Sequence, residues 1–490
     1  MFITILIVVA VFWIVIGFFD LVFKSCMLHP YLVLLEKSNL TFKPCQLQWY
    51  TSRWNRLFKK LSNYKARWLR KWFSFGSLVT SILIIPSLFL LAYTAKNMYD
   101  SLSYDIKTEQ ILQPVFPGVN LPLSHVIYYF VTLLMCSIFH ELGHALAAAR
   151  ENVKIHGSGL FIFGIFPGAF VDLSTESMTL LTPWQQLRIY CAGVWHNIVL
   201  VLCASFLLYV NAFLLFPFYQ YGSGVTVTYI AENSGVDGPA GLETGDVITA
   251  IVSCSIQTEE HWKKCLQDKI NQPSQGYCVP ITFIMQEDVA IKGSSNNPMF
   301  DCCNKESQNE LCFHHWTLND QEKYSCLPVR KLLQQSGGMC KTSEQCEDGS
   351  WTCIIPQIDN DTRLLQLYRN GKNSVIFIGS PMELYFSVSV SSWIPRNTVF
   401  PIPPIQMYET FLRYVISFSS ALAILNVVPG FLLDGFWITN TLMKLILPNF
   451  IKFISNRRHL EYFTLIIVSS GMLLLVINIL LSLIILIMIK

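Results

Sequence analysis

The sequence predicts a polytopic α-helical membrane protein that carries one large polar domain between its membrane helices. Hydrophobic residues make up 52% of the 490 residues and charged residues only 14%, a balance typical of membrane proteins. Several apolar runs reach the roughly 20 residues that a helix needs to cross a bilayer. A polar segment, 222–404, interrupts them and holds ten of the fifteen cysteines. The net charge of +3 is too small and too dispersed to indicate nucleic-acid binding.

The N-terminal part of the chain begins with two predicted membrane helices. The apolar run 1–23 has no basic start and no small-residue cleavage site, so we expect a retained helix rather than a signal peptide. A second helix is predicted over 74–95, where Pro86 can introduce a kink. A basic polar loop, 24–73, lies between them. Its charge favours the cytosol, whereas Asn39 lies in a glycosylation sequon, which is used only in the lumen.

The third apolar run, 123–149, carries the most informative motif, HELGH. His140 and His144 are separated by one helical turn, so both imidazoles leave the same face of a helix. Two nitrogens in this arrangement can share a Zn²⁺ ion, and Glu141 can act on a water bound to that ion. Polar and charged groups inside a membrane span are usually functional. The alternative is a structural role for both histidines.

A third metal ligand is predicted at Asp434, within a broken membrane helix over 407–447. Asp434 is the only acidic residue between Glu409 and Glu461, and a buried carboxylate is costly unless a cation neutralises it. Two histidines and one carboxylate leave a fourth zinc position for water, as hydrolysis requires. The alternative role for Asp434 is a helix cap beside Gly435.

Three further segments complete the predicted membrane part. The glycine-rich and aromatic segment 153–172 has the alternation of a membrane-associated β-hairpin, with a re-entrant packing loop as the alternative. The run 184–216 predicts a membrane helix, in which Gly193 permits close helix approach and Asn197 lies on the same face. The run 462–490 predicts a C-terminal membrane helix.

The cysteines of the polar segment predict a disulfide framework in an oxidising lumen. Zinc binding is the other possibility, but the segment contains no C-x-x-C pair. Asn360 lies in a second sequon, which agrees with a lumenal position. If this segment is lumenal, the helix 184–216 runs from cytosol to lumen and the helix 123–149 runs the other way. His140 and His144 are then expected near the cytosolic end of their helix.

The two motifs together resemble the site-2 protease family of intramembrane metalloproteases. The resemblance rests on HELGH in a membrane helix and on a distant N-x-x-P-x-x-x-L-D-G that ends at Gly435. It implies that His140, His144 and Asp434 hold one Zn²⁺ ion per chain and that Glu141 is the catalytic base.

The same resemblance implies further features of the site and the substrates. An embedded hairpin would receive the substrate by strand addition, and Asn197 would lie near the reaction centre as a candidate for orienting substrate or stabilising an oxyanion. The loop 24–73, with Asn39, would be lumenal. The expected substrates are single-span membrane-tethered transcription factors, already trimmed by a first lumenal cleavage. Sterol regulatory element-binding proteins and endoplasmic reticulum stress factors are the family's examples, and the expected location is the Golgi or endoplasmic reticulum membrane.

The polar segment has a second resemblance, to a PDZ domain. It rests on an apolar strand followed by Gly241-Leu242-x-x-Gly245-Asp246-x-Ile248. The run Met382–Trp393 alternates as a returning strand does. The resemblance implies a lumenal PDZ-like α+β domain, interrupted by a cysteine-rich insertion, that binds extended peptides by strand addition.

These features predict an intramembrane zinc endopeptidase that cleaves within the membrane segment of its substrate and frees a cytosolic fragment. Glu141 is expected to take a proton from a zinc-bound water and to return it to the leaving amine. One alternative is a non-catalytic membrane adaptor with a peptide-binding domain and a structural metal, for which His196 is the candidate fourth ligand. A zinc transporter is another alternative, although it normally carries more than one intramembrane ligand cluster.

Overall fold

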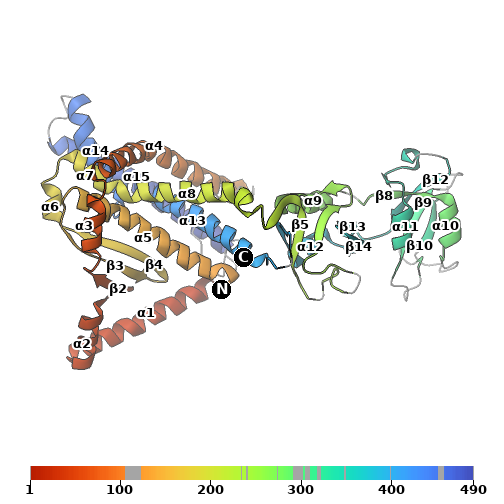
Figure 1. The fold of residues 1–490 in the computed structure, drawn as a ribbon, viewed down its shortest axis with the longest axis horizontal. Helices are drawn as coiled ribbons and strands as arrows, with labels where there is room; N and C mark the ends of the chain where they lie inside the picture. Colours follow the sequence, from red (N-terminus) through yellow and green to blue (C-terminus); the bar gives the residue numbers. More distant parts are fainter. Residues whose placement is uncertain are drawn as a thin grey trace. The chain divides into compact units, whose positions relative to one another are not determined.

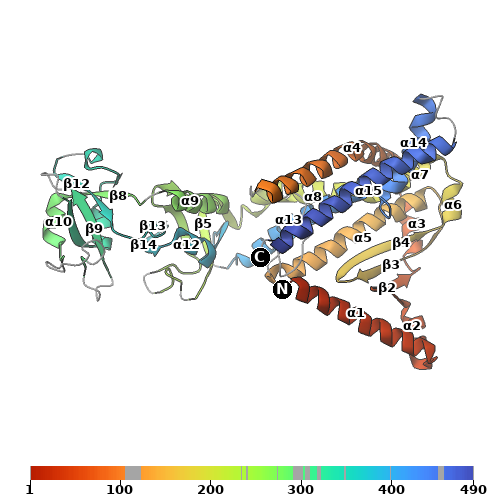
Figure 2. The same ribbon diagram turned by 180° about the vertical axis from the view of Figure 1, so that it is seen from behind.

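The computed structural model describes the whole chain except residues 1, 105–122, 233, 239–240, 273, 291–301, 304–308, 317–321, 347–348, 398, 451–456 and 489–490. The chain divides into two compact units (Figures 1 and 2). The membrane unit comprises Met1–Val210 and Tyr408–Lys490, and the insert unit comprises Asn211–Met407.

Six helices in the described part of the chain are long and apolar enough to cross a membrane. They are α1 (Phe2–Ser25), α4 (Ala66–Tyr104), α5 (Val126–Arg150), α8 (Ala192–Leu215), α13 (Pro403–Val427) and α15 (Arg457–Met488). A helix satisfies its own backbone groups, so its apolar side chains can face lipid. The protein is therefore a polytopic membrane protein, as the sequence predicts. The shorter helices of the membrane unit are α2 (His29–Ser38), α3 (Asn55–Asn63), α6 (Thr175–Thr179), α7 (Pro183–Tyr190), α14 (Asp434–Phe450) and the 3₁₀ turn η1 (Leu123–His125).

An antiparallel sheet lies beside α5 in the membrane unit (Figures 1 and 2). Its strands follow the order β1 (Leu40–Lys43), β2 (Gln46–Thr51), β3 (Ile155–Phe163) and β4 (Phe166–Leu173). The expected hairpin corresponds to β3 and β4. The segment 24–73, expected to be a polar loop, instead folds and adds two strands to this sheet. These two strands were not expected from the sequence because β2 pairs with β3, more than a hundred residues later in the chain, where Thr51 pairs with Ser158.

The sheet and α4 determine on which side of the membrane unit the segment 24–73 lies. Phe73, near the start of α4, packs with Ala147 and Ala148 near the end of α5, and with Ala192 at the start of α8. The segment therefore lies at the membrane face where α8 begins, whereas the insert follows the other end of α8. If α8 spans the membrane, a lumenal segment 24–73 and a lumenal insert exclude each other, so only one of these two expectations can hold.

Two predicted membrane helices are interrupted. The run 184–216 forms α7 and α8 rather than one helix, and the break falls at Cys191. The carbonyl oxygen of Ile189 accepts a hydrogen bond from a histidine of α5, which fixes the end of α7 against that helix. The run 407–447 forms α13 and α14, joined by the segment 428–433 that contains Pro429.

The insert unit contains two antiparallel sheets. The first has the order β14-β13-β6-β5-β15, with β7 paired to β6. Its strands are β5 (Tyr219–Ile230), β6 (Val247–Ile251), β7 (Cys254–Ser255), β13 (Arg363–Arg369), β14 (Lys372–Gly379) and β15 (Val388–Pro395), and its helices are α9 (Glu259–Asn271) and α12 (Pro381–Ser387). Trp262 of α9 and Phe377 of β14 are buried in its core.

The second sheet is inserted in sequence between α9 and β13. It has the order β10-β9-β12-β8-β11, and the core against it contains Phe313 and Leu332. Its elements are β8 (Gly276–Pro280), α10 (Ile281–Glu287), β9 (Glu310–Trp316), β10 (Glu322–Pro328), α11 (Val329–Gln335), β11 (Met339–Cys340), η2 (Ser343–Gln345) and β12 (Trp351–Pro356).

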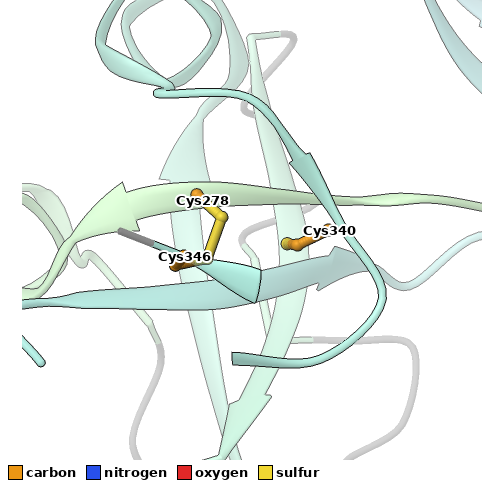
Figure 3. A group of neighbouring side chains, drawn as sticks. All are labelled: Cys278, Cys340 and Cys346. Atoms are coloured by element: carbon orange, nitrogen blue, oxygen red, sulfur yellow. A yellow bond between two sulfur atoms is a disulfide. The ribbon is translucent and has the colours of Figure 1, made fainter. Parts of the chain in front are cut away.

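All ten cysteines of the insert unit form disulfides. The pairs are Cys254–Cys265, Cys278–Cys346, Cys302–Cys312, Cys303–Cys326 and Cys340–Cys353. The sulfur atoms of Cys278, Cys340 and Cys346 lie close enough together to suggest a metal site (Figure 3). Each is bound in a disulfide, however, so none offers the thiolate that zinc requires.

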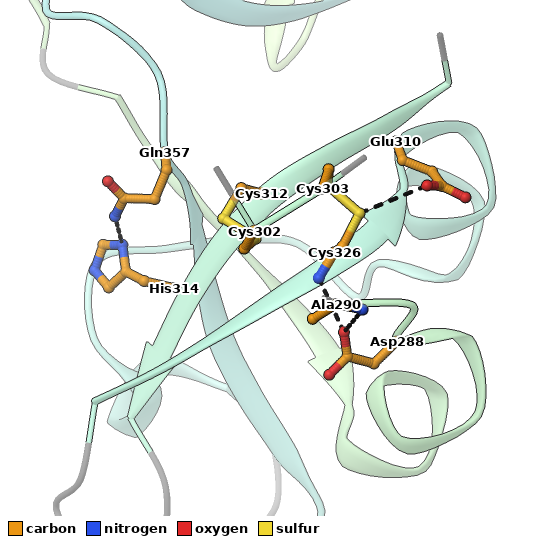
Figure 4. Close-up of a disulfide and its surroundings, with 9 residues drawn as sticks. All are labelled: Asp288, Ala290, Cys302, Cys303, Glu310, Cys312, His314, Cys326 and Gln357. Atoms are coloured by element: carbon orange, nitrogen blue, oxygen red, sulfur yellow. Dashed lines mark hydrogen bonds between the residues drawn. A yellow bond between two sulfur atoms is a disulfide. The ribbon is translucent and has the colours of Figure 1, made fainter. Parts of the chain in front are cut away.

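A second pair of disulfides ties the adjacent cysteines 302 and 303 to β9 and β10 (Figure 4). Beside them, Asp288 Oδ1 accepts hydrogen bonds from the backbone N–H groups of Ala290 and Cys326, at 3.1 and 2.9 Å. This carboxylate joins the end of α10 to β10, and the two disulfides cross-link the same region, as expected for a small domain stabilised by cross-links.

Candidate active site

The histidines of the HELGH motif lie one turn apart on the same face of α5. Their Nε2 atoms are 3.2 Å apart, and His140 and His144 are only 7% and 8% exposed. Side chains at this spacing lie one above the other on a helix. Two buried ring nitrogens at this distance need a common partner, because their lone pairs would otherwise repel each other.

Asp434 lies against both histidines although it is nearly three hundred residues away in the sequence. Its Oδ2 atom is 2.9 Å from Nε2 of His140 and 3.2 Å from Nε2 of His144. Asp434 is the first residue of α14, and Gly435 allows the helix to begin there. A Cβ atom at residue 435 would approach the carbonyl oxygen of Val428 to 2.0 Å, so a side chain at this position would push Asp434 out of place.

These donor atoms fit a zinc ion. Tetrahedral zinc with ligand bonds of about 2.0–2.1 Å separates its ligand atoms by roughly 3.3 Å, close to the observed 2.9–3.2 Å. Gly193 of α8 keeps the neighbouring space clear. A Cβ atom there would lie 2.3 Å from Nε2 of His144 and 2.6 Å from Nε2 of His140, where an ion has to fit.

The far nitrogen of each imidazole has a partner that fixes the ring. Nδ1 of His144 lies 2.8 Å from the carbonyl oxygen of Ile189, so Nδ1 carries the proton and Nε2 is left with a free lone pair. Nδ1 of His140 lies 3.2 Å from the amide of Asn197, whose Oδ1 is buried without another partner. Exchanging the amide oxygen and nitrogen, which differ little in shape, lets Oδ1 accept the Nδ1 proton. Both Nε2 atoms are then available to a metal.

Comparison with known proteins identifies the family. The model of peptidase family M50 matches residues 128–468, which include both histidines and Asp434. The chain belongs to peptidase family M50. It is also similar to the membrane-bound transcription factor site-2 protease homolog of Arabidopsis thaliana, with 26% identity over 451 residues, 80% of this chain and 84% of that relative. The protein is therefore an intramembrane zinc metalloprotease of the site-2 protease type.

Glu141 of this M50 protease lines a cavity between α5 and the sheet and interacts electrostatically with both histidines and with Asp434. The backbone of Val171 in β4 donates a hydrogen bond to its carboxylate. One turn earlier on α5, Ser137 Oγ accepts a hydrogen bond of 2.8 Å from the N–H of Ala169. The hairpin is thus held along the helix that carries the catalytic motif.

Asn197 does not face the open fourth position of the zinc site, where a group that contacts substrate would be expected. It is fully buried and contacts the nitrogen of His140 that faces away from Asp434. Asn197 lies beside the motif, as the resemblance implies. The geometry favours a role in orienting His140 over direct contact with an oxyanion.

His196 does not contribute to the cluster. Its ring stacks on Phe73, with ring centroids 5.8 Å apart. Within the described residues, the only other group of candidate ligands is the disulfide-bonded cysteine cluster. Two histidines and one carboxylate leave a fourth zinc position open, as in hydrolytic sites and unlike the closed sites of structural zinc. This argues against the adaptor alternative.

A buried ion pair supports the site and was missed by the sequence analysis. Arg188 lies 2.9 Å from Glu151, and both side chains are almost fully buried. Gln185 donates a further hydrogen bond of 3.0 Å to the same carboxylate. The pair joins α7 to the end of α5 next to Ile189, whose carbonyl orients His144. This ion pair could have been predicted from the sequence, because Glu151 and Arg188 carry opposite charges at the ends of two apolar segments.

Proposed function

We propose that His140, His144 and Asp434 hold one zinc ion per chain and that Glu141 is the general base for hydrolysis of a peptide bond within a substrate's transmembrane segment. The observation that carries this proposal is the convergence of the three donor atoms to within 3.2 Å of one another. They lie on apolar helices, and the carboxylate of Glu141 is adjacent in sequence to His140.

The chemistry follows from the position of each group. Zinc, when bound, lowers the pKa of a water molecule and polarises a carbonyl oxygen. Glu141 takes the proton of the attacking water and later delivers it to the leaving amine. Its carboxylate lines the cavity beside α5 and is close enough to both histidines and Asp434 to interact with them electrostatically, as the base for a water at this site must be. The buried surroundings limit access of other water to the reaction.

The hairpin beside α5 is suited to hold an unwound substrate. The last strand, β4, pairs only with β3 among the described strands. Along its other edge, the N–H of Ala169 is bonded to Ser137 Oγ. A substrate strand that displaces this hydroxyl would gain backbone hydrogen bonds without a strict sequence requirement. A helix in the membrane must unwind before its peptide bond can be attacked, and strand addition offsets part of that cost.

The insert unit is proposed to be a lumenal PDZ-like domain with a cysteine-rich insertion. The disulfides and the exposed sequon residue Asn360 support the lumenal side. The mixed sheet-and-helix fold of β5, β6, β13, β14 and β15 with α9 and α12 agrees with the PDZ resemblance. We propose that it admits substrates whose lumenal part has been shortened. With this orientation the active site lies towards the cytosol, and cleavage frees a cytosolic fragment.

The proposed substrates are membrane-tethered transcription factors of the sterol-response and stress pathways, in the Golgi or endoplasmic reticulum membrane. The name of the Arabidopsis thaliana relative, which refers to membrane-bound transcription factors, supports this class. The test uses purified protein in liposomes with a single-span substrate. We expect cleavage of the trimmed form, loss of cleavage on chelation and recovery with zinc. Cleavage that persists after complete zinc removal would exclude the proposed chemistry.

A further inference from the structure

A cavity of about 370 Å³ adjoins Glu141, and its remaining lining residues have no role in the chemistry described above. It lies between α5 and one face of the sheet, and Leu57 and Phe58 of α3 also line it. Cavities that bind small ligands start at about 300 Å³, so this space accepts a large side chain. Glu141 is the only ionisable residue among those that line it.

The floor of the cavity is formed by neighbouring strands. Trp49 of β2 pairs directly with Leu160 of β3, which in turn pairs with Ala169 of β4. Directly paired residues project from the same face of a sheet, so the three side chains form one row. All three line the cavity. The floor therefore depends on the pairing of the N-terminal segment with the hairpin.

The outer rim comes from Trp54 and from Leu57 of α3. These side chains are 51% and 41% exposed, whereas Phe58 behind them is buried. These half-exposed side chains therefore line the open side of the cavity. Trp49, Trp54 and Leu57 all precede the residues 128–468 that match the M50 family. The rim is thus added to the catalytic core by a separate segment.

We propose that this cavity binds a large apolar side chain, such as leucine or phenylalanine, next to the scissile bond of the substrate, and that Trp54 and Leu57 set its size limit. The inference rests on the proposed function, because it takes Glu141 as the base. A base must approach the attacking water to about 2.6–3.2 Å, so the scissile carbonyl lies close to Glu141. Successive residues are about 3.8 Å apart, so the adjoining side chain reaches the cavity.

The chemistry of the walls determines which side chains are accepted. A charged side chain would lose its hydration against aromatic and aliphatic groups and would be rejected. A small side chain would leave the cavity partly empty and would gain less from burial. Leucine should therefore be preferred to alanine by about ten-fold or more in kcat/KM, as expected for several methylene groups in an apolar pocket.

The experiment uses single-span peptides in liposomes. The peptides differ only in the two residues that flank the scissile bond, and the position of this bond is determined by mass spectrometry. Each position carries leucine, alanine or aspartate in turn. The variant Leu57→Trp reduces the cavity from its rim. The matched control is Leu61→Trp, on the same helix at 42% exposure but outside the cavity lining. Zinc content is measured on each protein.

We expect Leu57→Trp to lower kcat/KM for the leucine peptide about ten-fold or more, while the alanine peptide changes less than about two-fold. Leu61→Trp should leave both unchanged. Equal effects of Leu57→Trp on both peptides, or equal cleavage of both by the unmodified protein, would overturn the inference. An effect that follows the acyl-chain length of the liposomes rather than the peptide would assign the cavity to lipid and also overturn it. A zinc-loaded unmodified protein that cleaves no peptide would instead refute the proposed function.

Discussion

At residue 193, a single hydrogen atom in place of a methyl group keeps the centre of the site open. The Cβ atom of an alanine would lie 2.3 and 2.6 Å from the two Nε2 atoms, in the volume that an ion needs. We expect Gly193→Ala to lose bound zinc and to reduce cleavage at least about a hundred-fold. This loss is larger than that expected from mutating a residue that only hydrogen-bonds to a metal ligand. Zinc content and cleavage of a liposome substrate are the measurements.

The matched control is Gly17→Ala in α1, where an added Cβ atom meets nothing within 4 Å. This variant should keep both zinc and activity. A Gly193→Ala protein that retains stoichiometric zinc would show that the ion does not lie between the two histidines.

Asn197 offers a test between two roles. If its amide orients His140, Asn197→Leu should weaken zinc binding roughly 10- to 100-fold, as for other partners of metal ligands. Asn197→Asp keeps an oxygen acceptor and should recover much of the affinity. Unchanged zinc affinity together with a lower kcat would instead support the substrate contact that the sequence analysis predicts.

The zinc ligands could be proposed from the sequence because each motif can be recognised from its own neighbouring residues. His140 and His144 share a face through helix geometry alone, and a solitary acid such as Asp434 in an apolar stretch needs a cation. The role of Asn197 could not be read in this way, since it depends on which neighbour its amide faces. Ile189 contributes through its backbone, which side-chain motifs do not reveal.

Among the elements, α5 and α7 are joined by the ion pair of Arg188 and Glu151. The variant Arg188→Met leaves a buried carboxylate without its cation, which should cost roughly 3–5 kcal/mol of stability. We expect a lower midpoint of thermal unfolding and weaker zinc binding, because the Ile189 carbonyl is displaced. The double variant Arg188→Met/Glu151→Met should recover most of the stability.

The control is Lys263→Met, which removes an exposed ion pair with Glu259 in the insert unit. Exposed pairs contribute about 0–1 kcal/mol, so its unfolding midpoint should hardly move. If Arg188→Met is equally mild, the buried pair does not support the site.

Only part of the sheet in the membrane unit could be predicted from the sequence. The alternation of residues 153–172 is sufficient to predict β3 and β4. The strand β2 was missed because its basic surroundings suggested a loop, and its pairing with β3 is a long-range contact that local patterns do not contain. The most consequential result of this pairing is the cavity beside Glu141, which no single segment encodes.

At the scale of the whole molecule, the order of the helices makes a prediction about glycosylation. Asn39 and Asn360 are both exposed, so the side of the membrane decides which of them is modified. Because α8 separates the two segments, only one can face the lumen. We expect a glycan on Asn360, seen as a mobility shift on deglycosylation that Asn360→Gln abolishes and Asn39→Gln does not. Glycosylation at Asn39 alone would reverse the orientation, and glycosylation at both would contradict the fold.

The insert unit marks the limit of prediction at this scale. Ten cysteines allow so many connectivities that the pairing cannot be deduced from sequence. Their density was enough to expect an oxidised framework. The cysteine-rich insertion was expected, but not that it forms a sheet of its own, because β8 pairs with β12 across a long stretch of chain.

The most direct test of the mechanism measures zinc content and cleavage together on two variants, Glu141→Gln and Asp434→Ala. We expect Glu141→Gln to keep one zinc per chain and to lose cleavage at least about a hundred-fold, the usual contribution of a general base. Asp434→Ala should lose both. A zinc-loaded Glu141→Gln protein that cleaves at the rate of the unmodified protein would contradict the proposed role of Glu141, and full zinc content in Asp434→Ala would contradict the ligand set.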